Sequence, residues 1–186
     1  ASLIVPESLV QPHTYYLNNT ANTAHLIEQC AKYSVNNFIF SSTAAVYGDS
    51  KIGLVSEHSP TIPINPYGYS KLFSEQILKD TAVAYPEFKY CILRYFNVAG
   101  ANEDGLIGQS TYNATHLIKV AAQTALGRRK SASIFGENYP TPDGTCIRDY
   151  IHVDDLSRAH LFALHYLKEH QSDIFNVGYG KGYSVK

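Results

Sequence analysis

The chain has 186 residues, which corresponds to one domain or slightly more at about 150 residues per domain. Hydrophobic residues make up 45% of the chain and charged residues 17%, a composition that supports a packed core and excludes a disordered chain. The formal net charge is -1, so we expect no nucleic-acid partner, because such partners are bound by strongly basic surfaces.

We expect neither a membrane anchor nor a metal site. No apolar stretch approaches the ~20 residues needed to cross a bilayer, and residues 1–6 lack the charged start of a secretory signal. The three cysteines have no C-x-x-C spacing, which argues against a thiolate metal site and a disulfide framework. His160, His165 and His170 are five residues apart and therefore do not share a helix face. These features predict a protein of a reducing compartment, the cytoplasm.

The pattern of apolar residues and turn residues predicts helices that alternate with short strands. In the first half of the chain we expect a loop at 6–8, a helix over 15–34, a strand over 38–40 that ends in polar residues 41–43, a loop over 48–66, a helix from 65 to about 85 and a strand over 90–95. In the middle we expect a loop over 100–109, a helix over 114–126, a strand over 132–135 and turns over 137–145. The last elements expected are an extended segment over 149–153, a helix from 154 or 155 to about 170, and a strand over 174–177. This alternation indicates crossover connections in a parallel sheet, so the predicted fold class is α/β. Residues 1–3 resemble the end of a strand and 182–186 the start of a new element, which suggests a piece of a longer protein.

Tyr67 and Lys71 are the first candidate pair for chemistry. They are four residues apart near the start of a predicted helix, so they share one helix face. A nearby ammonium favours the phenolate, and we therefore expect Lys71 to lower the pKa of Tyr67 and make it a general base. The spacing alone also fits a solvated helix start. The polar residues 41–43 and 95–97 follow predicted strands, however, and open parallel sheets bind ligands at the carboxyl ends of their strands.

Five segments show a specific resemblance to known proteins. They are SSTAAVYG at 41–48, PYGYSK at 66–71, LRYFNVAG at 93–100, LGRR at 126–129 and GTCIRDYIHVDDL at 144–156. The first three resemble the extended short-chain dehydrogenase/reductase superfamily, and the last two are similar to its UDP-glucose 4-epimerases. The resemblance implies part of a doubly wound, parallel Rossmann-type sheet with part of a smaller substrate-binding domain. We expect residues 1–100 and 145–170 in the NAD-binding domain, and 101–144 and 171–186 in the nucleotide-sugar-binding domain. The family's Gly-rich loop and C-terminal segment are not found before Ala1 or after Lys186.

The resemblance also implies roles for individual residues. Tyr67 matches the catalytic base, Lys71 its partner, and Thr43 the hydroxyl that binds the 4-hydroxyl of the sugar. The implied cofactor-binding residues are Ala1, Ser2, Leu3, Asn18, Thr43, Tyr67, Lys71 and Phe96. The implied substrate-binding residues are Thr43, Tyr67, Asn97, His116, Leu117, Phe135 and Arg148, with Arg148 near the diphosphate.

Three of these residues have a plain structural alternative. Asn18 also fits the N-terminal cap of a helix. Arg148 also fits an ion pair with Asp149 or Asp154, and Phe135 also fits the hydrophobic core.

The implied activity is NAD-dependent epimerisation at C4 of a UDP-hexose, UDP-glucose or UDP-galactose, through a transient 4-keto intermediate. NAD is the implied cofactor, a UDP-sugar the substrate, and a homodimer the assembly. One alternative is a nucleotide-sugar 4,6-dehydratase, which places an Asp-Glu pair where this chain has Ala44 and Ala45. Another alternative is a non-catalytic nucleotide-sugar-binding fragment. NAD bound to the purified protein would favour the enzyme over this alternative.

Overall fold

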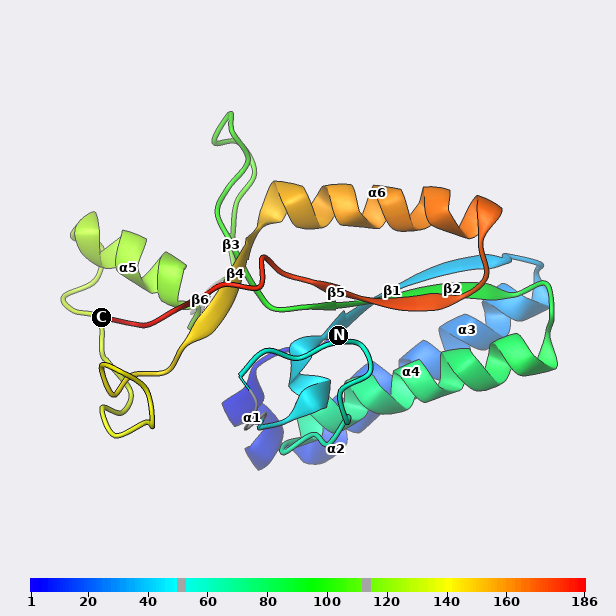
Figure 1. The fold of residues 1–186 in the computed structure, drawn as a ribbon, viewed down its shortest axis with the longest axis horizontal. Coiled ribbons are helices and arrows are strands. Elements are labelled where there is room, and N and C mark those ends of the chain that lie inside the picture. The colour runs from blue at the N-terminus through cyan, green and yellow to red at the C-terminus, as the bar shows by residue number, and fades with distance from the viewer. Residues whose placement is uncertain (50–52, 112–114) are drawn as a thin grey trace. The chain divides into compact units, whose positions relative to one another are not determined.

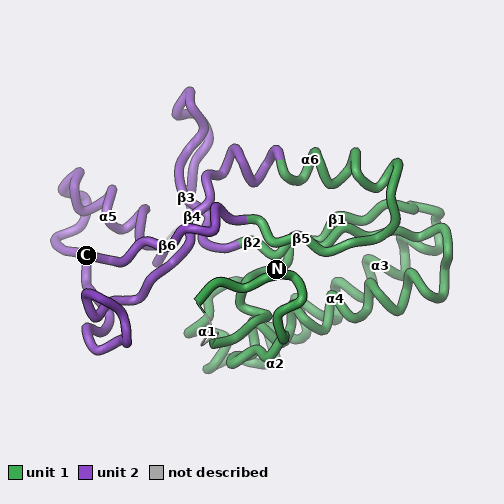
Figure 2. Tube along the Cα trace, in the orientation of Figure 1, with its two compact units in different colours: residues 1–95, 159–177 green, residues 96–158, 178–186 purple. Residues whose placement is uncertain are grey.

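The structure is a computed structural model that describes residues 1–49, 53–111 and 115–186. The chain forms two compact units (Figure 2). The first unit contains residues 1–95 and 159–177, and the second contains 96–158 and 178–186. These boundaries differ from the predicted domains, which grouped 171–177 with the sugar-binding part and both 96–100 and 145–158 with the NAD-binding part. Residues 173–177 belong to the first unit because they pair as a strand with its central strand.

The first unit is a parallel sheet with helices on both faces. Its elements are α1 (Val5–Val10), α2 (Pro12–Tyr15), the π-helix η1 (Tyr16–Ala21), α3 (Asn22–Lys32), β1 (Asn37–Thr43), the 3₁₀ helix η2 (Ala44–Tyr47), α4 (Pro66–Ala84), β2 (Lys89–Tyr95), most of α6 (Val153–Glu169) and β5 (Asp173–Val177). The strand order is β1-β2-β5, with all strands parallel. Helices α3 and α4 cover one face of the sheet and α6 covers the other (Figure 1). The predicted α/β class is confirmed.

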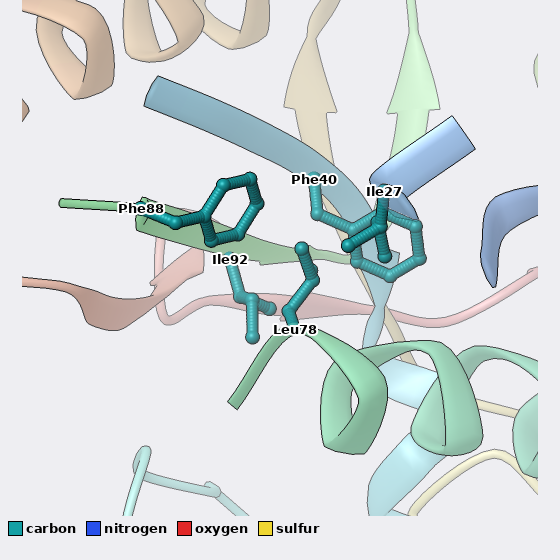
Figure 3. Close-up of a cluster of buried hydrophobic side chains, with 5 residues drawn as sticks. All are labelled: Ile27, Phe40, Leu78, Phe88 and Ile92. Atoms are coloured by element: carbon teal, nitrogen blue, oxygen red, sulfur yellow. The ribbon is translucent and has the colours of Figure 1, made fainter. Parts of the chain in front are cut away.

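Apolar side chains fill both interfaces between this sheet and its helices. Side chains of successive strand residues point to opposite faces, so Ile92 packs toward α4 whereas Cys91 and Leu93 pack toward α6. The cluster beneath α3 and α4 consists of Ile27, Phe40, Leu78, Phe88 and Ile92 (Figure 3). Leu78 and Ile92 are fully buried, and burying one such side chain stabilises a fold by roughly 1.5–3 kcal/mol.

The second unit has a small sheet and a helix of its own. It contains β3 (Asn97–Ala99), α5 (Leu117–Ala125), β4 (Arg148–His152), residues 153–158 of α6 and β6 (Gly182–Tyr183). Strand β4 pairs with β3 in parallel and with β6 antiparallel. The carboxylate of Asp149 accepts hydrogen bonds from the backbone amides of Tyr179 and Gly180 at 3.1 and 2.8 Å, which orders the glycine-rich turn before β6.

Several predicted elements differ from the structure. The predicted loop at 6–8 is part of α1, because proline fits the first turn of a helix. The predicted strand over 132–135 is absent: these residues are exposed and irregular, with no strand partner in the described chain. Residues 1–3 form no strand either. The predicted helix over 114–126 is α5, and Ala114 lies outside the described residues.

Candidate active site

The candidate catalytic residues in the first unit come from the carboxyl end of β1 and the first turns of α4. In the strand register Thr43 lies beside Tyr95, and Tyr95 beside Val177, so the three strands end at the same edge. Open parallel sheets bind ligands at this edge.

Helix α4 begins with a cap and a glycine that allow it to approach η2 closely. The side-chain oxygen of Asn65 accepts a hydrogen bond from the amide of Gly68 at 2.9 Å, and Pro66 occupies the first helical position. A Cβ at Gly68 would lie 2.7 Å from the carbonyl oxygen of Ala45 and 2.9 Å from Cβ of Pro63. Glycine therefore permits the close contact that brings Tyr67 to Thr43.

Lys71 is buried at this edge, with 8% of its surface exposed. Its Nζ donates a hydrogen bond to the carbonyl oxygen of Ser41 at 2.9 Å and lies 4.9 Å from the ring centroid of Phe40. Burial disfavours the charged ammonium and lowers the pKa of Lys71 to about 8, while the carboxylate of Glu75 acts in the opposite direction.

Tyr67 is half-buried, and its ring meets that of Tyr15 edge-on at a centroid distance of 6.4 Å. Burial raises the pKa of Tyr67 above its ordinary value, and a hydrogen bond with the Thr43 hydroxyl partly offsets this effect. The expectation that Lys71 lowers the pKa of Tyr67 is therefore wrong. Desolvation of the phenol is the largest cause of the shift, and the Lys71 ammonium donates to the Ser41 carbonyl.

Thr43 is 8% exposed and also caps η2, because its Oγ1 accepts a hydrogen bond from the amide of Ala45 at 3.1 Å. The structure thus gathers Thr43, Tyr67 and Lys71 at one edge of the sheet. A phenol, a hydroxyl and an ammonium in this arrangement can bind a sugar hydroxyl and move its proton.

The N-terminal cofactor candidates are tied to α4 by a residue that sequence reasoning missed. Asn19 is buried; its Oδ1 accepts from the amide of Ser2 at 2.7 Å, and its Nδ2 donates to the Ser2 carbonyl at 2.9 Å and to Oγ of Ser70 at 3.1 Å. Asn18 donates to Oγ of Ser2 at 3.0 Å from inside η1, so it is not a helix cap. Ala1 and Leu3 flank Ser2 and are exposed.

The remaining candidates lie in the second unit. Phe96 and Asn97 stand at the start of β3, and Leu117 begins α5 directly after His116, whose Nδ1 lies 2.6 Å from Nε2 of Gln109. The core alternative for Phe135 is wrong, because this side chain is 86% exposed.

Arg148 begins β4 and is also exposed. Its guanidinium donates a hydrogen bond to the Ile147 carbonyl at 3.1 Å. Within the part of the chain that the structure describes it forms no ion pair, so the expected alternatives with Asp149 and Asp154 are not found.

Two charged residues beneath the site were also missed. Glu75 and Arg94 are 0% and 2% exposed and form a bidentate ion pair. Arg94 interrupts the apolar run of β2, which is the only indication of this pair in the sequence, and its partner is 19 residues away.

The described residues contain neither a metal-binding cluster nor a membrane-spanning helix. Residues 1–49, 53–111 and 115–186 contain no group of three His, Cys, Asp or Glu side chains that could bind a metal ion. None of the helices in the same ranges is long and apolar enough to cross a membrane.

A parallel sheet covered by helices, with polar side chains gathered at the carboxyl ends of its strands, defines a nucleotide-binding protein of the Rossmann-like class. Comparison with known proteins agrees. The sequence profile of the NAD dependent epimerase/dehydratase family matches residues 3–178, and the chain belongs to this family.

Individual relatives give the same result. The chain is 54% identical over 186 residues to a UDP-glucose 4-epimerase of Azospirillum brasilense, covering 100% of this chain and 53% of that protein. The crystal structure of UDP-glucose 4-epimerase from Brucella ovis in complex with NAD matches with a TM-score of 0.94 at 46% identity, over 100% of this chain and 57% of that one. The UDP-Glc/GlcNAc 4-epimerase from Campylobacter jejuni matches with a TM-score of 0.83 at 62% identity, over 100% and 56%. The chain thus spans about half the length of these relatives.

Proposed function

We propose that the protein containing this chain interconverts UDP-glucose and UDP-galactose by epimerisation at C4, with NAD as its cofactor. The observation that supports this most directly is the juxtaposition of Thr43, Tyr67 and Lys71 at the carboxyl ends of the parallel strands. The names of the relatives, UDP-glucose 4-epimerases, agree with this activity.

The residues of the first unit fit a nicotinamide dinucleotide. The Lys71 ammonium has three N–H groups, of which the Ser41 carbonyl accepts one, so further donors are available for ribose hydroxyls. Asn18 and Ser2 add amide and hydroxyl groups near α4, and we assign Ala1 and Leu3 to the same cofactor. We also assign Phe96 to it, although this residue belongs to the second unit. When bound, NAD supplies the hydride chemistry that none of these side chains can perform.

Each catalytic side chain then has one task. The Tyr67 phenolate accepts the proton of the sugar's 4-hydroxyl and returns it once the 4-keto sugar has turned over in the site. Thr43 orients the sugar oxygen through its hydroxyl. Lys71 donates hydrogen bonds to the ribose hydroxyls of the cofactor.

We assign the second unit to the nucleotide-sugar. Arg148 is an exposed guanidinium without an ion-pair partner in the described chain, and such a group binds a diphosphate bidentately. Five further residues are assigned to the sugar and the nucleotide; these are Asn97, His116, Leu117, Phe135 and, from the first unit, Thr43. Ala44 and Ala45, which follow Thr43 in η2, cannot transfer protons, so nothing favours a dehydratase.

We further propose that the protein is a cytoplasmic homodimer. Tyr69 and Phe73 are 38% and 45% exposed on α4, with ring centroids 6.0 Å apart, and the ring of Tyr16 lies 6.0 Å from Phe73. Exposed aromatic clusters of this kind mark protein interfaces. Light scattering that shows only monomer at micromolar concentration would contradict the dimer.

The test of the proposed function uses the complete protein that contains residues 1–186. We expect it to purify with NAD and to convert UDP-galactose into UDP-glucose. Tyr67→Phe removes the proton carrier and lowers turnover roughly 10²–10⁴-fold, while Tyr85→Phe, an exposed tyrosine at the end of the same helix, leaves it unchanged. Wild-type turnover in Tyr67→Phe, or no conversion by the wild type, would refute the proposal.

A further inference from the structure

Directly beneath the candidate catalytic residues, a buried ion pair connects α4 to β2 and β1. Nε of Arg94 donates to Oε1 of Glu75 at 3.0 Å, and the second guanidinium nitrogen donates to Oε2 at 2.6 Å. The Ser42 hydroxyl donates to Oε1 at 2.5 Å. Ser42 and Arg94 are neighbours in the strand register, so one carboxylate joins three elements.

The pair lies where it can act on the site. Tyr67, Lys71 and Glu75 are spaced four residues apart along α4 and so lie along one side of the helix. Ser42 lies between Ser41, whose carbonyl binds Lys71, and Thr43. Of the two partners of the Glu75 carboxylate, Ser42 thus adjoins Thr43 in the chain, and Arg94 lies beside Ser42 in the sheet.

Stability alone does not explain such a pair. Removing a carboxylate and a guanidinium from water is costly, and well-packed apolar residues of similar volume often stabilise a core as well or better. Ile92, two residues earlier on the same face of β2, shows that a buried apolar side chain packs well at this interface.

The orientation of Arg94 is fixed by further contacts. A guanidinium nitrogen donates to the Tyr47 hydroxyl at 3.0 Å, and the guanidinium carbon lies 5.0 Å from the centroid of the Tyr47 ring. The Tyr47 hydroxyl donates to Oδ1 of Asn176 at 2.6 Å, and the Asn176 amide donates to Oε1 of Glu57 at 2.7 Å. The network therefore extends from α4 across the sheet to β5.

We propose that Glu75 is a positioning residue of the reaction: its carboxylate, oriented by Arg94 and Ser42, fixes the middle of α4 to the end of β1 and so holds Lys71, one helical turn earlier, beside the Ser41 carbonyl. Its role in the reaction rests on the proposed function, whereas its effect on Lys71 does not.

The charges around Lys71 agree with this role. Glu75 is the charged group that raises the pKa of Lys71 against the effect of burial, and it lies on the same helix. From β1, the uncharged Ser41 carbonyl and the Phe40 ring contact the Lys71 ammonium. Arg94 from β2 carries the opposing charge, which two hydrogen bonds direct onto the Glu75 carboxylate.

The test compares Glu75→Gln with Asp80→Asn in the complete protein. Asp80 is an exposed carboxylate on the same helix, so its variant removes one negative charge away from the site. The pKa of Lys71 is followed by NMR of the side chain in lysine-labelled protein. We expect Glu75→Gln to lower this pKa by roughly one unit or more and to shift the alkaline limb of the activity profile to lower pH by the same amount. Asp80→Asn should change neither.

Two more variants separate charge from folding. Glu75→Asp retains the charge and should keep the pKa of Lys71 near the wild-type value. The double variant Glu75→Gln/Arg94→Gln leaves no unpaired buried charge if Glu75→Gln fails to fold, and should still lower the pKa. An unchanged pKa of Lys71 in a folded variant without Glu75 would overturn the proposal. If the wild type does not epimerise, the proposed function fails, and the NMR titration still decides the effect of Glu75.

Discussion

Lys71→Met should stabilise the fold at neutral pH while abolishing the proposed reaction. Lys71 is 8% exposed, and Met has a similar length and no charge to desolvate. Burial lowers the pKa of Lys71 from 10.5 to about 8. At ~1.36 kcal/mol per pKa unit, the charged ammonium costs about 3 kcal/mol of folding free energy at pH 7.

The pH dependence gives the sharper measurement. Between pH 8 and 10.5 the unfolded chain keeps the Lys71 proton and the folded chain loses it. The free energy of unfolding of the wild type therefore rises with pH relative to that of Lys71→Met. The difference in free energy of unfolding between Lys71→Met and the wild type should therefore decrease by about 3 kcal/mol over this range. The variant also removes the hydrogen bond to the Ser41 carbonyl, which costs ~1–3 kcal/mol and changes little with pH.

The assay is urea denaturation of both proteins from pH 7 to 10.5, with Lys79→Met on the same helix as the control. Subtracting the two denaturation series cancels the titration of the tyrosines. A difference between wild type and Lys71→Met that does not change with pH would refute the reasoning. It would mean that the Lys71 ammonium is solvated in the folded state, or that neighbouring groups fully offset the cost of its desolvation.

The other predictions concern packing and substrate binding. Gly68→Ala should lower the free energy of unfolding by about 1–3 kcal/mol, because the new Cβ would lie 2.7 Å from the Ala45 carbonyl oxygen; a stabilised variant in urea denaturation would contradict this. Leu78→Ala should cost about 2–5 kcal/mol in the same assay, since Leu78 is fully buried between α4 and the sheet, and a cost under 1 kcal/mol would be unexpected. Arg148→Ala should raise KM for the UDP-sugar with kcat little changed, and equal affinity for UDP by calorimetry would exclude its diphosphate contact.

The elements that the sequence predicts well are long and regular. Helix α4 has an N-cap, a proline at its first position and nineteen residues, and β1 and β2 each contain a continuous apolar run, which is typical of strands in a parallel sheet. Some short or irregular elements were not predicted, although the five-residue strand β5 was. Helix α1 begins at a proline that also suits a loop, and the segment 132–135 has strand-like residues but no strand to pair with.

The candidate site was predictable only in part, for a physical reason. Tyr67 and Lys71 are close in sequence, and a local rule places them on one helix face. The pair of Glu75 and Arg94 depends on contacts between residues far apart in the sequence, as does the sign of the pKa shift of Tyr67. Desolvation of Tyr67 is a property of the folded environment, and no local spacing rule contains it.

The polar residues beneath the site and part of the apolar core lie on the same face of the sheet, in rows that are two residues apart along each strand. The apolar row consists of Phe40, Ile92 and Ile174, and the next row on the same face consists of Ser42, Arg94 and Asn176. Helix α4 matches this change, since Leu78 packs on the apolar row and Glu75 on the polar one. Because side chains in neighbouring rows on one face are about 7 Å apart, the apolar row can fix the helix that positions the catalytic side chains. The polar row costs desolvation energy, and the apolar row next to it offsets that cost without entering the chemistry.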